Sequence, residues 1–279
     1  MPHVTVPSGA ELYYKRVGAG PPLLLIMGTG LDHTAWQRQI RAYSPHFECI
    51  LFDNRGAGKS TAPSGDLSVK AMAEDAAGLL DGLRIGSAHV SGLSLGSCIA
   101  QELTLARPEL VETLQLHGTW GRGDGYAARK FRAQIALIEK MELRDFYNIN
   151  VLWFLTPEYM FFSPEKVERR IESILRAAPS REILAQQYRA NLGHDSLDRL
   201  GAITAPTLVT VGSFDTAIPP MYGRAVAEAI PGARLVEFAG GGHLHNVEQP
   251  GEFNAITLEW MLGHAPPILS RPTAPFRGR

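Results

Sequence analysis

The chain is poor in cysteine and in excess charge of either sign. Its 279 residues include only two cysteines, Cys49 in an expected strand and Cys98 in an expected helix, and their positions fit neither a disulfide framework nor a metal site. The 27 basic and 28 acidic residues leave a formal net charge of -1, with no basic stripe for nucleic acid and no polybasic patch for a membrane. We therefore expect a small neutral or weakly charged substrate as the partner; self-association into a homo-oligomer stays open.

Long apolar runs and nucleotide-binding loops are also missing. No run approaches the length needed to span a membrane, and the start of the chain lacks a charged segment followed by a long apolar one, so we expect a cytoplasmic protein. The glycine-rich loop at 53–60 does not have the spacing of a phosphate-binding loop, because Gly56 lies only two residues before Gly58. We interpret this loop as structural and expect no metal and no cofactor.

What is present is a regular alternation of strand and helix. Short apolar runs typical of buried strands alternate with stretches of helical period. We expect strands at 3–6, 11–17, 23–27, 49–52, 113–117, 207–211 and 234–238, helices at 34–43, 68–83, 221–230 and 252–262, and a further strand and helix on either side of Ser94. This order predicts an α/β fold with a doubly wound, mostly parallel sheet that begins with a hairpin.

The alternation stops after the sixth strand. Between residues 121 and 198 the sequence has only helical patterns, which predicts a helical cap inserted into the sheet domain. The core then comprises residues 1–120 and 199–264. The tail at 265–279 contains four prolines, and we expect it to be disordered or bound to the surface.

Ser94 is the candidate nucleophile. It is the centre of Gly92-Leu93-Ser94-Leu95-Gly96, which follows an apolar run beginning at Ala88 and precedes a stretch of helical period. A serine raised above a sheet on a sharp strand-to-helix turn needs small neighbours, because strand and helix pass closely beneath it. The pattern and its position together predict a nucleophilic serine at the carboxyl end of a central strand.

A serine hydroxyl needs a base to take its proton and an acid to orient that base. In an open parallel sheet these groups gather at the carboxyl ends of the strands. Asp215 follows the strand at 207–211, and His243 follows the strand at 234–238 through a run of glycines. His245 is the rival base and Asp124, after the sixth strand, the rival acid; we favour His243 and Asp215.

In this arrangement the sequence resembles the α/β-hydrolase family over nearly all of the chain except the insertion and the last residues. The resemblance rests on the 53–60 loop, on 92–96, on Asp215 before Pro219, and on Gly242-His243 ahead of Glu248. It implies a substrate pocket between cap and core. One departure is Met27-Gly28, where many relatives have His-Gly.

The oxyanion hole is expected to consist of the backbone N–H groups of Thr29 and Leu95, since amides at a tight turn or a helix start can point at a developing negative charge. The insertion is rich in large apolar side chains, some of which we expect to select an apolar or aromatic substrate. Candidate substrate contacts are Trp36, His117, Trp120, Trp153 and Phe154, although a structural role is at least as plausible for His117 and Trp120.

The predicted activity is that of a cofactor-free serine hydrolase that cleaves a carboxylic ester or a lactone through an acyl-enzyme. The same residues serve thioesters, amides and carbon–carbon bonds beside carbonyls, so these alternatives remain open. Epoxide opening and dehalogenation are disfavoured, because they use a carboxylate where this chain has Ser94. The resemblance makes methyl-ester cleavage of a bulky natural product and enol-lactone opening the leading candidate reactions. A non-catalytic role in ligand binding or cyclisation is the alternative from another class.

Overall fold

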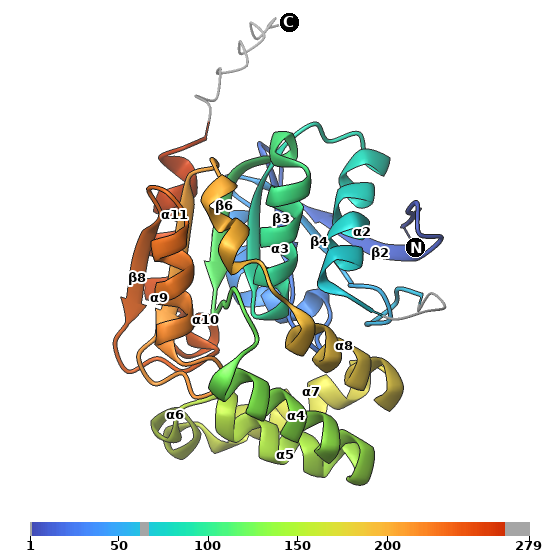
Figure 1. Ribbon diagram of the computed structural model, residues 1–279, viewed down its shortest axis with the longest axis vertical. Helices are drawn as coiled ribbons and strands as arrows, with labels where there is room; N and C mark the ends of the chain where they lie inside the picture. The colour runs from blue at the N-terminus through green and yellow to red at the C-terminus, as the bar shows by residue number, and fades with distance from the viewer. Residues whose placement is uncertain (1, 62–66, 266–279) are drawn as a thin grey trace, which may run out of the picture.

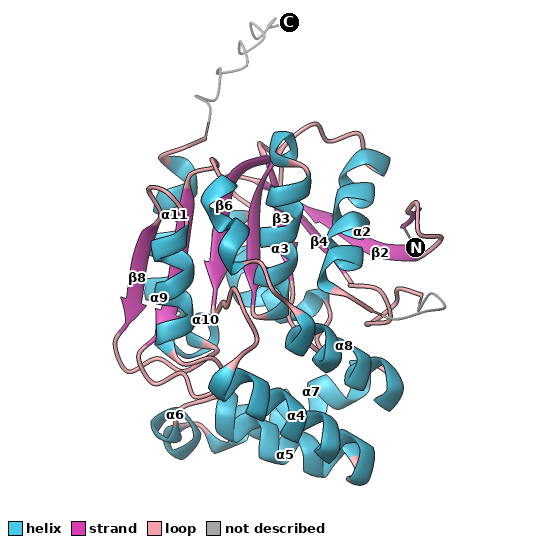
Figure 2. Cartoon of the chain, in the orientation of Figure 1, coloured by secondary structure: helices cyan, strands magenta, loops and turns pink. Residues whose placement is uncertain are grey.

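The structure, a computed structural model, describes residues 2–61 and 67–265. Within these residues one eight-stranded sheet has the order β1-β2-β4-β3-β5-β6-β7-β8 (Figure 1, Figure 2). The strands are β1 His3–Thr5, β2 Glu11–Val17, β3 Pro22–Ile26, β4 Glu48–Phe52, β5 Ala88–Leu93, β6 Val111–His117, β7 Thr207–Gly212 and β8 Arg234–Phe238. The pairs β1–β2 and β2–β4 are antiparallel and all others are parallel. The predicted mostly parallel sheet and its leading hairpin are confirmed.

Helices cover both faces of the sheet. On one face α1 (Gln37–Tyr43) contacts α11 (Pro250–Leu262), and the Tyr43 hydroxyl lies 2.6 Å from Oγ1 of Thr257. On the other face α2 (Val69–Gly82) packs beside α3 (Leu95–Ala106), and α9 (Pro220–Ala229) packs against β7. Short helical turns complete the connections: η1 His33–Trp36, η2 Pro108–Leu110, η3 Leu197–Ala202 and α10 His245–Glu248. Because helices lie on both sides, all six residues of β5 are buried, as in other doubly covered parallel strands.

Five helices separate β6 from β7: α4 Gly125–Lys140, α5 Leu143–Phe154, α6 Pro157–Phe162, α7 Pro164–Ala177 and α8 Arg181–Gly193. We call residues 125–193 the helical insertion. Figure 1 shows it lying across the end of the sheet toward which the parallel strands point. At its base Arg122 pairs with Asp195 in an isolated bridge, and the Arg122 guanidinium contacts Asp198 at 2.6 Å. The fold therefore carries its helical segment after the sixth strand, as predicted; the domain boundaries at 120/121 and 198/199 stay a prediction.

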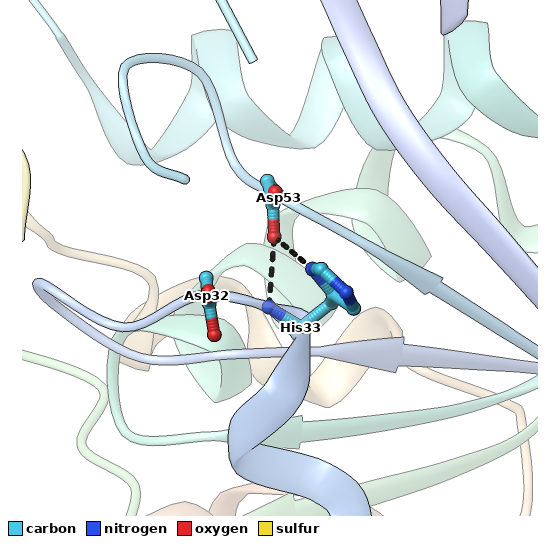
Figure 3. A group of neighbouring side chains, drawn as sticks. All are labelled: Asp32, His33 and Asp53. Carbon is cyan, nitrogen blue, oxygen red and sulfur yellow. Dashed lines mark hydrogen bonds and ion pairs between the residues drawn. The ribbon is translucent and has the colours of Figure 1, made fainter. Parts of the chain in front are cut away.

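The 53–60 loop is organised around the buried carboxylate of Asp53 (Figure 3). Its Oδ1 accepts a hydrogen bond from the His33 backbone N–H at 2.8 Å and lies 2.7 Å from the His33 ring, and its Oδ2 accepts from the Lys59 N–H at 2.9 Å. Gly58 has φ +52°, and a Cβ there would lie 2.3 Å from the Asp53 carboxylate. Asp32, also drawn in Figure 3, accepts from Thr34 N–H instead. These contacts support the structural interpretation of the loop.

No helix within residues 2–61 and 67–265 is both long and apolar enough to cross a bilayer. The cellular compartment stays a prediction. The prediction of a disordered or surface-bound tail falls almost wholly on residues 266–279, which lie outside the described part of the chain.

Candidate active site

Ser94 occupies the turn between β5 and α3. Its backbone has φ 56° and ψ -123°, a conformation that L-residues other than glycine rarely adopt. The turn is held from below, because the Ser94 N–H donates to the His117 carbonyl at 2.8 Å and the Ser97 hydroxyl donates to the Ser94 carbonyl at 2.6 Å. Such strain persists only where the surroundings fix it, and it lifts the serine side chain above the end of the sheet.

The two glycines of the motif allow this close approach. A Cβ at Gly92 would lie 2.2 Å from the Gly96 carbonyl oxygen, and a Cβ at Gly96 would lie 2.2 Å from the Ile26 oxygen on β3. Real Cβ atoms do not come so near to backbone oxygens, so neither position accepts a larger residue without moving a strand. Gly28, two residues after β3, also lies close to the serine: a Cβ there would lie 3.0 Å from Cβ of Ser94.

Asp215 and His243 form a buried pair at the ends of β7 and β8. Oδ1 of Asp215 accepts from the N–H groups of Ala217 and Ile218, both at 2.8 Å, which fixes the carboxylate. Its Oδ2 lies 2.7 Å from Nδ1 of His243. An ionised carboxylate can only accept, so Nδ1 of His243 is the donor and a neutral ring presents an unprotonated Nε2.

Nε2 of His243 is the other end of this arrangement. The atom is buried, and no residue in the described part of the chain hydrogen bonds to it. His243 and Ser94 line the same pocket, together with Gly28 and Thr29 from the turn after β3. An acceptor nitrogen of this kind, beside a serine in a pocket, has the position of a general base.

Of the two expected oxyanion donors, Thr29 lines this pocket and Leu95 directly follows Ser94 in the chain. Leu95 is the first residue of α3, where a backbone N–H has no acceptor within the helix. Thr29 lines the pocket, and its hydroxyl accepts from the Asn191 side chain of α8 at 2.9 Å. Both N–H groups remain candidates for stabilising an oxyanion, on position alone.

The rival base and acid lie elsewhere. His245 is fully buried, with Nε2 2.8 Å from Oγ1 of Thr210 and Nδ1 3.2 Å from the Gly242 carbonyl oxygen. Burial lowers the pKa of His245 to about 4, as expected for a neutral structural histidine. Asp124 is exposed at the start of α4, and its backbone carbonyl accepts from the Tyr222 hydroxyl. Neither residue lines the pocket of Ser94.

Four of the five expected substrate contacts also lie outside this pocket, and we withdraw them. Trp36 and Trp120 are fully buried as core packing, the latter against Phe131. His117 is buried between Ser91 and Thr210, and burial lowers its pKa well below the usual value. Trp153 is partly exposed on α5, and its carbonyl accepts from the Thr216 hydroxyl. None of these four side chains is among the residues that line the pocket of Ser94.

Phe154 does line the pocket. Its ring stacks on the His243 ring at 5.2 Å between centroids with an interplanar angle of 26°. The helical insertion adds further lining residues that sequence analysis missed: Tyr147, Asn150, Val151, Leu155, Arg170 and Ile174. Their helical spacing was visible in the sequence, but it does not say which face of the helix turns toward the sheet.

Gly118 is a further residue that the sequence analysis did not single out. It follows β6 with φ +55°, and a Cβ there would lie 2.9 Å from Cε1 and 3.0 Å from Nδ1 of His243. The signal was a glycine directly after a buried strand. Glycine at this position leaves room for the imidazole ring.

Glu248 ties the His243 loop to the insertion. Its carboxylate accepts from the Gly242 N–H at 3.0 Å and from the Thr156 N–H at 2.7 Å, and burial raises its pKa. The Leu244 N–H donates to the Phe154 carbonyl at 3.1 Å. The segment that carries His243 is therefore bonded directly to the end of α5 and the start of α6.

Comparison with known proteins places the chain in a family. Residues 21–250, which are most of the chain, match the model of the family described as the alpha/beta hydrolase fold. The chain belongs to this family, and hydrolytic activity is supported by the relatives that follow.

A protein of Azorhizobium caulinodans that bears the name of a carbamate hydrolase, RutD, is 31% identical over 89% of this chain and 94% of its own length. Among solved structures, a thermophilic esterase from Thermogutta terrifontis, with malate bound, has a TM-score of 0.85 and 30% identity over 95% of this chain and 99% of its own. The enol-lactonase from Burkholderia xenovorans has a TM-score of 0.86 and 26% identity over 94% of this chain and 100% of its own. This chain is similar to three hydrolases of different substrates.

Proposed function

We propose that the protein is a serine hydrolase that cleaves a carboxylic ester or a lactone of a small, largely apolar substrate. The observation that carries the proposal is the buried pair of Asp215 and His243, whose Nε2 has no partner in the described residues and belongs to the same pocket as Ser94. Ser94 is the nucleophile, His243 the general base and acid, and Asp215 the orienting acid.

The reaction proceeds through an acyl-enzyme. His243 takes the hydroxyl proton of Ser94 while Oγ attacks the carbonyl carbon, and the N–H groups of Leu95 and Thr29 stabilise the oxyanion. His243 then gives this proton to the leaving alkoxide as the carbon–oxygen bond breaks. In the second half His243 takes a proton from water, hydroxide attacks the acyl group, and Ser94 leaves with that proton.

The pocket favours an ester or lactone with an apolar part, since Leu31, Val151, Phe154, Leu155 and Ile174 form much of its wall. Similarity to an esterase and to an enol-lactonase points in the same direction. The relative named as a carbamate hydrolase makes carbamate cleavage the second candidate, because the same serine can attack a carbamate carbonyl. Comparing kcat/KM for an ester and a carbamate with the same alkyl part decides between them.

A serine-directed fluorophosphonate tests the central role. We expect a mass increase of one adduct on the peptide that contains Ser94, and loss of both the adduct and ester turnover, by several orders of magnitude, in Ser94→Ala. His245→Ala is the matched control for His243→Ala, because both are buried histidines of the same segment and only His243 lines the pocket. A protein that stays unlabelled and inactive on esters, lactones and carbamates would favour the non-catalytic, ligand-binding role.

A further inference from the structure

The pocket that contains Ser94 opens toward a larger groove. The pocket has a cavity volume of about 30 Å³, and the groove beside it has one of about 540 Å³. Three residues line both: Leu31 after β3, and Arg170 and Ile174 on α7. We call this place the junction. A substrate that reaches Ser94 from the groove passes these three side chains.

Arg170 has no partner at the junction. In the described ranges, 2–61 and 67–265, no residue makes a hydrogen bond or an ion pair with its guanidinium, although it is only partly exposed. Four other arginines of the insertion pair with glutamates, among them Arg144 with Glu172 at 2.6 Å and Arg169 with Glu165 at 3.4 Å. The arginines of the insertion without such a pair are exposed, except Arg170: Arg129, Arg132 and Arg176. Removing a cation from water without a counter-charge raises the free energy of the folded protein, and a ligand that supplies the charge offsets this cost.

The electrostatic surroundings agree with this. Burial first and Arg38 second lower the pKa of Arg170 to about 10, while Tyr159 raises it, and no carboxylate contributes to the shift. Arg38, Lys166 and Arg169 also line the groove, and the only acidic side chain among its described lining residues is Asp32. The Asp32 carboxylate accepts from Thr34, both from its N–H and from its hydroxyl. The groove therefore leads an anion toward Arg170.

The inner pocket supplies a second unused donor. The Tyr147 side chain on α5 lines it and is 5% exposed, and its hydroxyl has no hydrogen-bond partner within the described residues. No aspartate or glutamate is among the described residues that line the pocket. The wall opposite the sheet thus offers a planar cation and a hydroxyl, between apolar side chains, with no acceptor for either.

We propose that Arg170 binds a carboxylate of the substrate, so that the hydrolase acts on an ester or lactone that carries an acid group at a distance from the scissile carbonyl. The carboxylate lies at the junction and the carbonyl at Ser94. The proposal rests on the proposed function, since it describes the substrate of that reaction. One guanidinium matches one negative charge, and its planar fork fits the two oxygens of a carboxylate. A monoanion also agrees with the weakly charged substrate expected from the sequence.

The test compares two esters with the same leaving group. One is the mono-para-nitrophenyl ester of glutaric acid, and the other is its neutral counterpart with an isopropyl group in place of the carboxylate. We expect wild type to have the higher kcat/KM with the acidic ester. Arg170→Met should lower that value on the order of 10- to 100-fold and change the neutral ester by less than about threefold. Arg170→Lys should recover part of the loss.

Arg176→Met is the matched control, because Arg176 is an exposed arginine of the same helix and lines neither the pocket nor the groove. It should leave both esters unchanged. A wild type that prefers the neutral ester overturns the proposal, as does an equal loss for both esters in Arg170→Met, which would assign Arg170 a structural role.

Failure of the proposed hydrolase activity can be distinguished from failure of the proposed carboxylate site at Arg170. If wild type hydrolyses neither ester, calorimetric titration with glutarate decides the anion site without turnover. Binding to wild type that weakens at least about tenfold in Arg170→Met, and is kept in Arg176→Met, supports a carboxylate site in a non-catalytic protein. Absence of glutarate binding to wild type would rule the site out.

Discussion

The ends of the sheet strands and the helical insertion differ in how their large polar side chains are paired, although Gln134, Asn150 and Tyr188 of the insertion bond to one another. At the strand ends the Asp215 carboxylate accepts from two backbone N–H groups and from His243, and Thr210 bonds to both His117 and His245. In the insertion, Lys130 and Tyr147 are buried and Arg170 is half-buried, and the described residues give none of them a hydrogen-bond or ion-pair partner.

This difference separates two tasks. Bonded side chains at the strand ends hold one geometry, which a reaction with a fixed sequence of proton transfers requires. Unpaired polar groups in the insertion cost the protein folding free energy, and a ligand that supplies the missing partner gains binding free energy there. We infer that the sheet carries the chemistry and the insertion the recognition, and the following substitutions test that division.

The largest effect is expected at the core acid. Asp215→Asn keeps the size of the side chain but removes the charge that orients His243, so kcat should fall about 10³- to 10⁴-fold while KM changes little. Asp124→Asn is the control, because Asp124 is exposed and outside the pocket. The measurement is the steady-state rate of hydrolysis of an activated ester, which gives kcat and KM for each variant. A larger loss in Asp124→Asn would move the acid to the end of β6.

The next effect is on stability and concerns Lys130. Its ammonium lies 4.7 Å from the Phe131 ring centroid and 5.7 Å from that of Phe154, and burial lowers its pKa to about 7, against the opposing influence of Asp215. Between pH 7 and the unfolded pKa near 10.5 the unfolded chain binds more protons, so this residue makes the free energy of unfolding rise with pH. The free energy of unfolding that it contributes is greatest above that window and decreases as the pH falls from about 10.5 to about 7.

The comparison of variants isolates Lys130. The two buried cysteines have raised pKa values and act in the opposite direction above about pH 8.5. We therefore expect the stability of Lys130→Met relative to wild type to fall by about 1–2 kcal/mol from pH 7 to pH 9, in urea titrations at each pH. Lys140→Met, on the exposed end of the same helix, should show no such change. A constant difference for Lys130→Met would mean that its amine titrates as in water.

Gly118 tests how tightly the core holds its histidine. In Gly118→Ala the new Cβ must share space with the His243 ring, which Asp215 and Phe154 already hold on other sides. We expect kcat/KM to fall on the order of 10- to 100-fold for every ester. Gly9→Ala is the control for backbone strain, since Gly9 has φ +84° and nothing within 4 Å of its Cβ position. An equal loss of activity in both would trace the effect to stability.

How far the sequence predicts this site depends on which of the two regions is considered. Ser94, Asp215 and His243 each follow a parallel strand, Ser94 directly and the other two through short loops, so their position along the chain alone brings them to one edge of the sheet. The residues of the insertion lie on helices, where neighbours point about 100° apart and the sequence does not say which face meets the sheet. Tyr147 and Arg170 were therefore missed. Trp36 and Trp120 lie outside the insertion, and the sequence did not show that both side chains are buried in the core.

The smallest effect tests the contact between the two regions, at the adjacent pair Trp153 and Phe154. Only Phe154 lines the pocket, and its ring stacks on His243. A stacked aromatic contact is worth about 0.5–1.5 kcal/mol, so Phe154→Ala should lower kcat/KM about two- to tenfold. The loss should be similar for a short acetyl ester and a bulky one, because the Phe154 ring holds the His243 ring in place whatever the size of the substrate. Trp153→Ala should change neither, although it removes a larger side chain from the same helix. If Phe154→Ala instead spared the acetyl ester and penalised the bulky one, the ring would select substrate without steadying the histidine, and the insertion would act by recognition alone.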